Sequence, residues 1–93
     1  MDTRQLRAFC AVVERRSFSQ AADRLGVTQP AVSLQVRALE KRLATKLLDR
    51  SGRRVEPTES GRKLYNAAQR LLQLEEEIVA DPFGNRLEMR AGI

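Results

Sequence analysis

An apolar residue recurs at positions i, i+3, i+4 and i+7 within residues 3–16, which is the pattern of one buried stripe on a helix. The stripe consists of Leu6, Phe9, Cys10 and Val13. Charged residues lie mostly outside it. The chain is therefore predicted to begin with an amphipathic helix.

Cap and turn residues divide the next stretch, "SFSQAADRLGVTQPAV", into a short helix and the start of a longer one. Ser17 is a suitable N-cap, and Gln20 three residues later completes a capping box. Gly26 fits the left-handed position that ends a helix. Thr28 is the next predicted N-cap, and Pro30 falls in the first turn, where its missing N–H costs nothing.

The third helix is predicted over residues 29–43 and has two different faces. The inner apolar stripe is formed by Val32, Val36, Leu39 and Leu43. At 100° per residue, the outer face carries Pro30, Ser33, Leu34, Arg37 and Lys41. A helix that only packed a core would have little use for such an exposed set. The order of helix, short helix, tight turn and longer helix is the helix-turn-helix pattern, which many small bundles share.

Two short strands are predicted around the polar turn "RSGRR". Leu47, Leu48 and Val55 flank this turn, and Gly52 suits the tip of a hairpin. Pro57 cannot donate a hydrogen bond to a strand ladder, so the second strand must lie at an edge or end there. These features predict a β-hairpin wing after the third helix.

A last long helix is predicted to begin at Thr58, and it carries two apolar stripes. The first is a heptad seam formed by Leu64, Ala67, Leu71, Leu74 and Ile78. The second, beside it, consists of Tyr65, Ala68, Leu72 and Val79. So small a domain can hardly cover both stripes, which favours a homodimer through the first one. The alternative is a single helix with a wide face on its own core.

These elements predict three segments along the chain. A winged helix-turn-helix spans residues 1–57, a linker and dimerisation helix spans 58–80, and a hinge with the start of a further domain spans 81–93. The turn residues of "DPFGN" end the helix, and the tail "RLEMRAGI" alternates like a strand without a partner. We infer that the chain is the N-terminal part of a longer protein.

The charge of the chain is unevenly distributed. Residues 1–63 hold 14 Lys and Arg residues against 7 Asp and Glu residues, whereas residues 64–93 hold 3 against 5. The formal charge is thus +7 in the first part and −2 in the second, within a total of +5. A basic front indicates a polyanionic partner, although a well-solvated surface would give the same count.

The chain is poor in catalytic and metal-binding groups. It has 0 His, no Gly-rich phosphate loop and no Cys/His metal spacing, so we expect neither an enzyme nor a cofactor in this fragment. The single cysteine, Cys10, cannot form an internal disulfide, which fits a reducing cytoplasm. No apolar run approaches the ~20 residues of a membrane span, and we expect no membrane partner.

The segments "SFSQAADRLGVTQPAVSLQVRALE" and "LLDRSGRRVEPTESG", in this order, resemble the N-terminal DNA-binding domain of LysR-type transcriptional regulators. The resemblance covers residues 1 to about 79 and is far more specific than a bare helix-turn-helix. It implies a mainly α winged helix-turn-helix and a linker helix that dimerises antiparallel on loosely two-fold sites of double-stranded DNA. It also implies that the full-length protein is a tetramer responding to a small-molecule effector. RNA polymerase is a further candidate partner.

Four positions depart from the residues usual in that family. Arg16 and Ala44 stand where glycine is common, Leu48 stands where phenylalanine is common, and Pro57 stands where leucine is typical. These are core and turn positions at the ends of helices and in the wing.

The resemblance and the residue chemistry together predict that the outer face of the third helix contacts base edges in the major groove. Gln29 can pair bidentately with adenine, and Pro30 and Leu34 suit a thymine methyl group. Ser33 can bond a base or a phosphate. Without DNA, Gln29 and Pro30 would only start the helix, and Ser33 would be plain solvated surface.

Phosphate contacts are predicted around the groove, where they position a domain without reading sequence. The candidates are Ser17, Ser19, Thr28, Gln35, Arg37 and Arg50. Arg53, and after it Arg54, are predicted to enter the minor groove from the wing, because a narrow minor groove attracts arginine. For Arg37 and Arg54 the alternative is a solvated charge.

The sequence therefore predicts a sequence-specific DNA-binding domain of a transcription regulator. A protein-interaction module is the second class, but the basic outer face and the paired "TQPAVS" and "RSGRR" features favour DNA. An enzyme, the third class, has no supporting set of residues.

Overall fold

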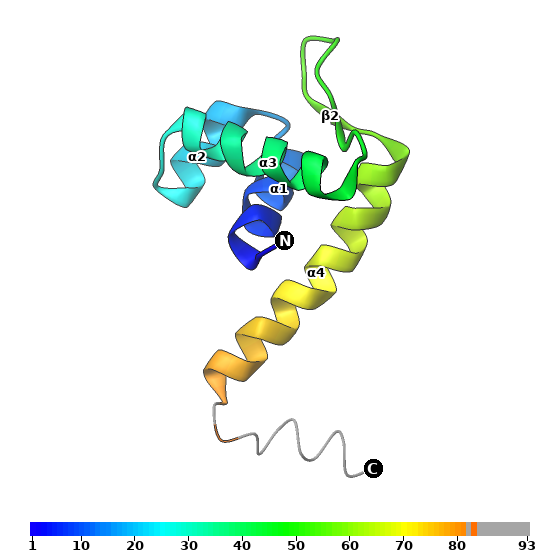
Figure 1. Cartoon of the computed structure of the whole chain (residues 1–93). Coiled ribbons are helices and arrows are strands. Elements are labelled where there is room, and N and C mark those ends of the chain that lie inside the picture. Colours follow the sequence, from blue (N-terminus) through cyan, green and yellow to red (C-terminus); the bar gives the residue numbers. More distant parts are fainter. Residues whose placement is uncertain (82, 84–93) are drawn as a thin grey trace.

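Four helices and a two-stranded hairpin make up residues 1–81 and 83, which are the residues that the structure, a computed structural model, describes (Figure 1). The elements are α1 (Thr3–Arg15), α2 (Phe18–Leu25), α3 (Gln29–Leu43), β1 (Leu48–Asp49), β2 (Glu56–Pro57) and α4 (Glu59–Ala80). The predicted winged helix-turn-helix followed by a long helix is confirmed. The predicted start of a further domain falls on residues 82 and 84–93, which lie outside the described residues.

Helices α1, α3 and α4 begin at side-chain caps that the local sequence supplies. The Asp2 carboxylate accepts from the Gln5 amide at 3.0 Å, and the Gln5 side chain accepts from the Asp2 amide at 3.3 Å. This capping box fixes the start of α1, although the sequence analysis overlooked it. Thr28 and Thr58 cap α3 and α4 as predicted.

Three helices end at a residue in the left-handed conformation. Gly26 ends α2 with φ of 69°, which glycine adopts without steric cost. Arg16 ends α1 with φ of 54°, and Ala44 ends α3 with φ of 50°. In these two residues the Cβ atom disfavours the conformation. The resemblance to the LysR family implies glycine at both positions, and the backbone here has the conformation that glycine favours.

The hydrophobic core lies where α1, α2 and α3 meet. Phe9 of α1 is fully buried, and a buried side chain of this size contributes about 1.5–3 kcal/mol to the free energy of unfolding. On α3, Val32, Val36 and Leu39 are buried as predicted. Leu43, in the last turn of α3, is 38% exposed, so the predicted inner stripe ends one turn early.

The wing is a short antiparallel hairpin in which Leu48 of β1 pairs with Pro57 of β2. The second strand ends at Pro57, as the missing amide donor requires. The first strand is attached to α3 because the Glu40 carboxylate accepts from the amides of Leu47 and Leu48, at 2.8 and 3.3 Å. A carboxylate of the third helix therefore sets where the wing begins.

The start of α4 packs closely on the segment that leads into β1. A Cβ atom at Gly61 would overlap the Leu47 carbonyl oxygen and would lie 3.3 Å from the Pro57 Cβ. The Thr58 hydroxyl also donates to the Lys46 carbonyl at 2.7 Å. Glycine at position 61 therefore permits an approach that a larger residue would prevent.

The two stripes of α4 have different surroundings. Tyr65, Ala68 and Leu72 of the second stripe pack against the core of the domain. In the predicted dimer seam, Leu71, Leu74 and Ile78 are exposed by 43%, 44% and 50%, and Ala67 is also exposed. Leu64, also predicted in the seam, is half-buried and packs against the core of its own domain. Val79, predicted in the second stripe, is 74% exposed, since it lies near the end of the protruding helix.

Candidate nucleic-acid interface

The outer face of α3 is exposed, as its residue spacing predicts. Gln29 and Pro30 lie exposed in the first turn, and Arg37 is exposed two turns later. Leu34 between them is 66% exposed and adds an apolar group to the otherwise polar face. Ser33 is half-buried beside it. The face offers amide, apolar and cationic groups together, a combination that base edges and phosphates can use.

The first turn of α3 also has groups that favour a bound anion. The Thr28 hydroxyl oxygen accepts from the Ala31 amide at 3.3 Å, and the Thr28 carbonyl accepts from the Val32 amide at 3.2 Å. A hydroxyl that accepts one bond still has its proton to donate. The positive end of the helix dipole lies at the same place. Thr28 is thus able to cap α3 and to contact a phosphate at once.

The start of α2 provides a second polar corner. The Ser17 hydroxyl accepts from the Gln20 amide at 3.2 Å and lies 3.1 Å from the Ser19 hydroxyl. The forward half of the predicted capping box is therefore present. Ser19 is exposed and Ser17 is half-buried, so Ser19 is the more accessible of the two predicted phosphate contacts.

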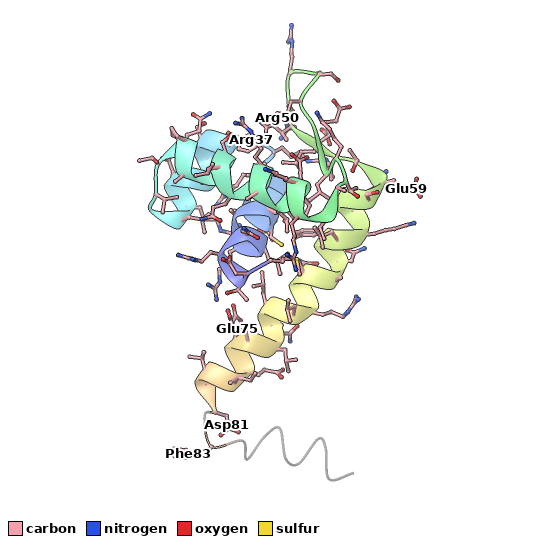
Figure 2. The ribbon with its side chains drawn as sticks, viewed as in Figure 1. Arg37, Arg50, Glu59, Glu75, Asp81 and Phe83 are labelled. Carbon is pink, nitrogen blue, oxygen red and sulfur yellow. The ribbon has the colours of Figure 1, made fainter. Side chains whose placement is uncertain are left out.

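Arg50 stacks on an aromatic ring at the base of the wing. Its guanidinium carbon lies 4.2 Å from the centroid of the Phe18 ring. Stacking of this kind uses the face of the guanidinium and leaves the N–H groups at its edge free to donate. Figure 2 shows Arg50 and Arg37 on the side of the domain from which the hairpin projects. The stacking therefore holds Arg50, one of the predicted phosphate contacts, in place in the absence of DNA.

In the part of the chain that the structure describes, three arginines on this side have no acidic partner, whereas two arginines behind it do. Within residues 1–81 and 83, Arg37, Arg53 and Arg54 form no ion pair, and all three are exposed. By contrast, Arg7 pairs with an acid of α4 and Arg24 pairs with an acid of α1. The positive charge of the wing and of α3 is therefore left available to an external anion.

Gln35 lies away from the centre of the outer face. It is half-buried and lines an apolar hollow of about 210 Å³, together with Leu25, Val27 and Arg4. Gln35, predicted as a phosphate contact, thus lies at the edge of the buried stripe of α3. A contact from Gln35 to DNA would have to be made at the border of the interface.

Several residues that position the interface were missed by the sequence analysis. Glu40 attaches the wing to α3, and Phe18 supports Arg50. Arg16, at the end of α1, pairs with Glu56 of β2. An acid within a basic helix and an aromatic residue between two serines are signals for the first two. The ion pair joins residues 40 positions apart, so no local pattern indicates it.

A polar network joins three helices behind the interface. The Glu14 carboxylate of α1 accepts from Arg24 of α2 and, at 2.8 Å, from the Tyr65 hydroxyl of α4. Gln69 donates to the same hydroxyl at 2.9 Å. Burial acts to raise the pKa of Glu14, but the bonds from Arg24 and Tyr65 outweigh it and lower that pKa. Burial and the bond to Glu14 raise the pKa of Tyr65 to about 12.

The described residues offer little for covalent or metal chemistry. Burial, reinforced by the charge of Glu14, raises the pKa of Cys10 to about 11, so this thiol stays protonated and is a poor nucleophile. In residues 1–81 and 83, no three His, Cys, Asp or Glu side chains are grouped so as to hold a metal ion. Nor does any helix in this part of the chain have the length and apolar character needed to cross a bilayer.

Solved structures and curated proteins similar to this chain include DNA complexes and transcriptional regulators. The crystal structure of the BenM_DBD/catB site 1 DNA complex has a TM-score of 0.84 at 42% identity, covering 86% of this chain and 89% of that one. The CbnR_DBD–DNA complex has a TM-score of 0.79 at 40% identity, covering 98% and 99%. Among curated proteins, an uncharacterised HTH-type transcriptional regulator of Azotobacter vinelandii is 51% identical over 77 residues, 83% of this chain.

The present chain is shorter than these curated relatives. It spans 54% of the length of the Azotobacter protein. It spans 26% of the HTH-type transcriptional regulator BenM of Acinetobacter baylyi, to which it is 42% identical over 80 residues, 86% of this chain. The model of the family described as bacterial regulatory helix-turn-helix protein, lysR family, matches residues 3–62. The matched region contains the exposed outer face of α3 and the basic wing. The chain therefore belongs to the LysR family of bacterial regulatory helix-turn-helix proteins.

Proposed function

We propose that this chain binds double-stranded DNA in a sequence-specific manner, as the DNA-binding part of a LysR-type transcriptional regulator. The outer face of α3 is the observation that carries the proposal, because it exposes Gln29 and Leu34 without a partner on the domain. The unpaired cations of the wing extend that face. Similar domains of BenM and CbnR were solved as DNA complexes, which supports the same ligand here.

In this proposal the elements divide the work of binding. The first turns of α3 enter the major groove, where Gln29, Pro30, Ser33 and Leu34 meet base edges. The wing places Arg53 and then Arg54 at the minor groove. The remaining contacts go to phosphates and come from Ser17, Ser19, Thr28, Gln35, Arg37 and Arg50.

We further propose that two copies pair through α4. The seam residues Leu71, Leu74 and Ile78 are exposed on a helix that leaves the domain, and heptad spacing suits them to a second helix. Two domains joined in this way would bind two half-sites in inverted orientation, since a two-fold dimer presents the same surface twice. In this proposal Leu71, Leu74 and Ile78 contact the partner rather than the core of their own domain.

A second part of the proposal concerns the activity of a full-length protein that contains this chain. The curated relatives are transcriptional regulators, and this chain spans only 54% of the Azotobacter protein and 26% of BenM. We propose a non-enzymatic regulator that works in the cytoplasm on the nucleoid and becomes a tetramer at full length. A small-molecule effector would bind outside this segment, RNA polymerase would be the functional partner, and DNA binding by this segment would need no cofactor.

Selection from random duplex DNA by the 93-residue chain tests the proposal. The expected winners carry two related half-sites in inverted orientation, and their affinity falls steeply with salt because phosphate contacts release counterions. Enrichment of a single half-site would keep the base-reading role of α3 but remove the dimer. Salt-sensitive binding without enrichment would contradict sequence-specific reading, and no binding at any salt would favour a protein-interaction module.

A further inference from the structure

The wing is attached to the corner between α1 and α2 by contacts from both of its strands. After β1, Arg50 stacks on Phe18 at 4.2 Å. Before β2, the Val55 amide donates to the Arg16 carbonyl oxygen at 3.4 Å. Within β2, Glu56 pairs with the Arg16 guanidinium. Arg16 thus contacts the returning strand through its backbone and through its side chain.

The wing needs such an attachment because its own pairing is small. Each strand has two residues, and the four residues between Arg50 and Val55 form a loop of bends. A two-stranded hairpin is at best marginally stable by itself. The direction of the loop that carries Arg53 and Arg54 therefore depends on what holds the two strands at their base.

Arg16 adopts a backbone conformation that a glycine would adopt more easily. Its φ of 54° places it in the left-handed region. Ala44 has the same conformation at the end of α3, with φ of 50°, but its side chain is a methyl group without polar reach. Arg16 differs because its side chain reaches β2. A non-glycine residue in this conformation suggests that its side chain has a use there.

We propose that Arg16 is a positioning residue that holds the wing, through Glu56, in the direction needed to contact DNA. The inference rests on the proposed DNA-binding function. The role assigned to Arg16 is to hold Glu56 and the wing, because one edge of its guanidinium donates to the Glu56 carboxylate. Glu56 would serve the same purpose, although it is an acid at the edge of a surface that meets a polyanion.

The direction in which Glu56→Gln changes DNA affinity distinguishes the positioning role from a simple effect of charge. If Glu56 acted only as a charge, its neutralisation would strengthen DNA binding, since a repulsion would be removed. If Glu56 holds Arg16 and the wing, the same substitution weakens binding. We expect a loss of roughly twofold to fivefold, which is the range for a half-exposed ion pair.

Arg16→Gly should weaken DNA binding by a similar factor while leaving the fold at least as stable, because glycine relieves the left-handed backbone. Ala44→Gly is the matched control, since it relieves the same conformation at a residue without a contact to the wing. Arg15→Ala is the control for lost charge, because Arg15 is the exposed neighbouring residue. Both controls should bind DNA within twofold of the original chain.

The full 93-residue chain and its variants would be measured by two readouts. The first is affinity for a selected duplex, including the double variant Arg16→Gly/Glu56→Gln. That variant should bind no more weakly than the weaker single variant, because both changes break one pair. The second is the NMR order parameter of the Gly52, Arg53 and Arg54 amides without DNA. These values should fall in both single variants and stay unchanged in Ala44→Gly.

The outcomes distinguish the inference from the function on which it rests. Tighter or unchanged binding by Glu56→Gln, or additive losses in the double variant, would overturn the positioning role. Unchanged order of the wing amides in Arg16→Gly would do the same. If the original chain bound no duplex at all, the proposed function would fail, while the order parameters would still show whether Arg16 holds the wing.

Discussion

The Tyr65 hydroxyl of α4 donates a hydrogen bond of 2.8 Å to the Glu14 carboxylate of α1. Since Arg24 of α2 bonds the same carboxylate, Glu14 connects three helices at one point. The long helix is thereby fixed to the helix-turn-helix by a polar contact as well as by its buried stripe. Its direction relative to α3 follows from these contacts.

Removal of the Tyr65 hydroxyl should lower stability without disturbing the core. Tyr65→Phe keeps the ring but takes away a donor to Glu14, and solvent around this exposed carboxylate weakens the bond, so we expect the free energy of unfolding to fall by roughly 0.5–1.5 kcal/mol. Urea denaturation followed by circular dichroism measures it. Gln69→Ala, which removes only the second bond to that hydroxyl, should cost less. If both variants lost the same free energy of unfolding, the bond from Tyr65 to Glu14 would contribute no more than the bond from Gln69 to Tyr65.

The contribution of Glu14 should depend on pH. Its pKa is lowered in the folded chain, so its ionised form stabilises the fold above its ordinary pKa of 4.5, and this stability is lost as the pH falls through the lowered value. The original chain should therefore be more stable than Glu14→Gln near neutral pH, and the difference should shrink below about pH 4.5. Thermal unfolding of both chains over this range is the test. A difference independent of pH would mean that the charge of Glu14 contributes nothing.

A charge within the α4 seam should separate the proposed dimer. Leu71→Glu places a carboxylate among the exposed apolar residues, where a second helix would bury it without a partner. Sedimentation equilibrium should show a monomer with unchanged helical content. The substitution Gln73→Glu, which adds the same charge at an exposed position on the other side of the helix, should leave the mass unchanged. A dimeric Leu71→Glu chain would place the interface elsewhere.

Loss of the Gln29 amide should relax the reading of one base pair. Gln29→Ala removes a donor and acceptor pair suited to adenine, so discrimination at one position of the selected site should fall by roughly 1–3 kcal/mol. Competition binding with single-base variants of the duplex measures the change. Equal weakening on every sequence would mean that Gln29 serves only to start α3.

The wing arginine should act through charge. Arg53→Ala should weaken binding to all duplexes and reduce the slope of log affinity against log salt by about 1 unit. Arg70→Ala, which removes an equally exposed arginine from α4, is the control for net charge and should leave the slope unchanged. An unaltered slope in Arg53→Ala would remove this residue from the contacts.

Local signals explain why the helix boundaries could be predicted. Thr28, Pro30 and Thr58 act within one turn of their own positions, so their residue types are enough to place the starts of α3 and α4. The outer face of α3 follows from periodicity for the same reason. Leu34 is exposed because its angle on the helix turns it away from Val32 and Val36.

Other features depend on residues that are distant in sequence. The bond between Tyr65 and Glu14 spans 51 positions, and the pair of Arg16 and Glu56 spans 40, so periodicity gives no sign of either. Leu64 has the spacing of the seam, but the helix enters the domain at that turn and the core covers it. A stripe on a helix predicts that something packs there, while the identity of the partner is set by the tertiary fold.

The direction of α4 depends on the close approach at Gly61, which is possible because this residue lacks a Cβ atom. A tilt of the helix at this point would displace its far end. A helix of 22 residues is about 33 Å long at 1.5 Å per residue. A larger residue at position 61 that tilted the helix by about 5° would move its far end by roughly 2.5 Å. In a paired assembly, the distance between two recognition helices would change by a comparable amount. The preferred spacing between two half-sites would then depend on Gly61, whose neighbours in the fold are Leu47 and Pro57 rather than residues of the outer face of α3.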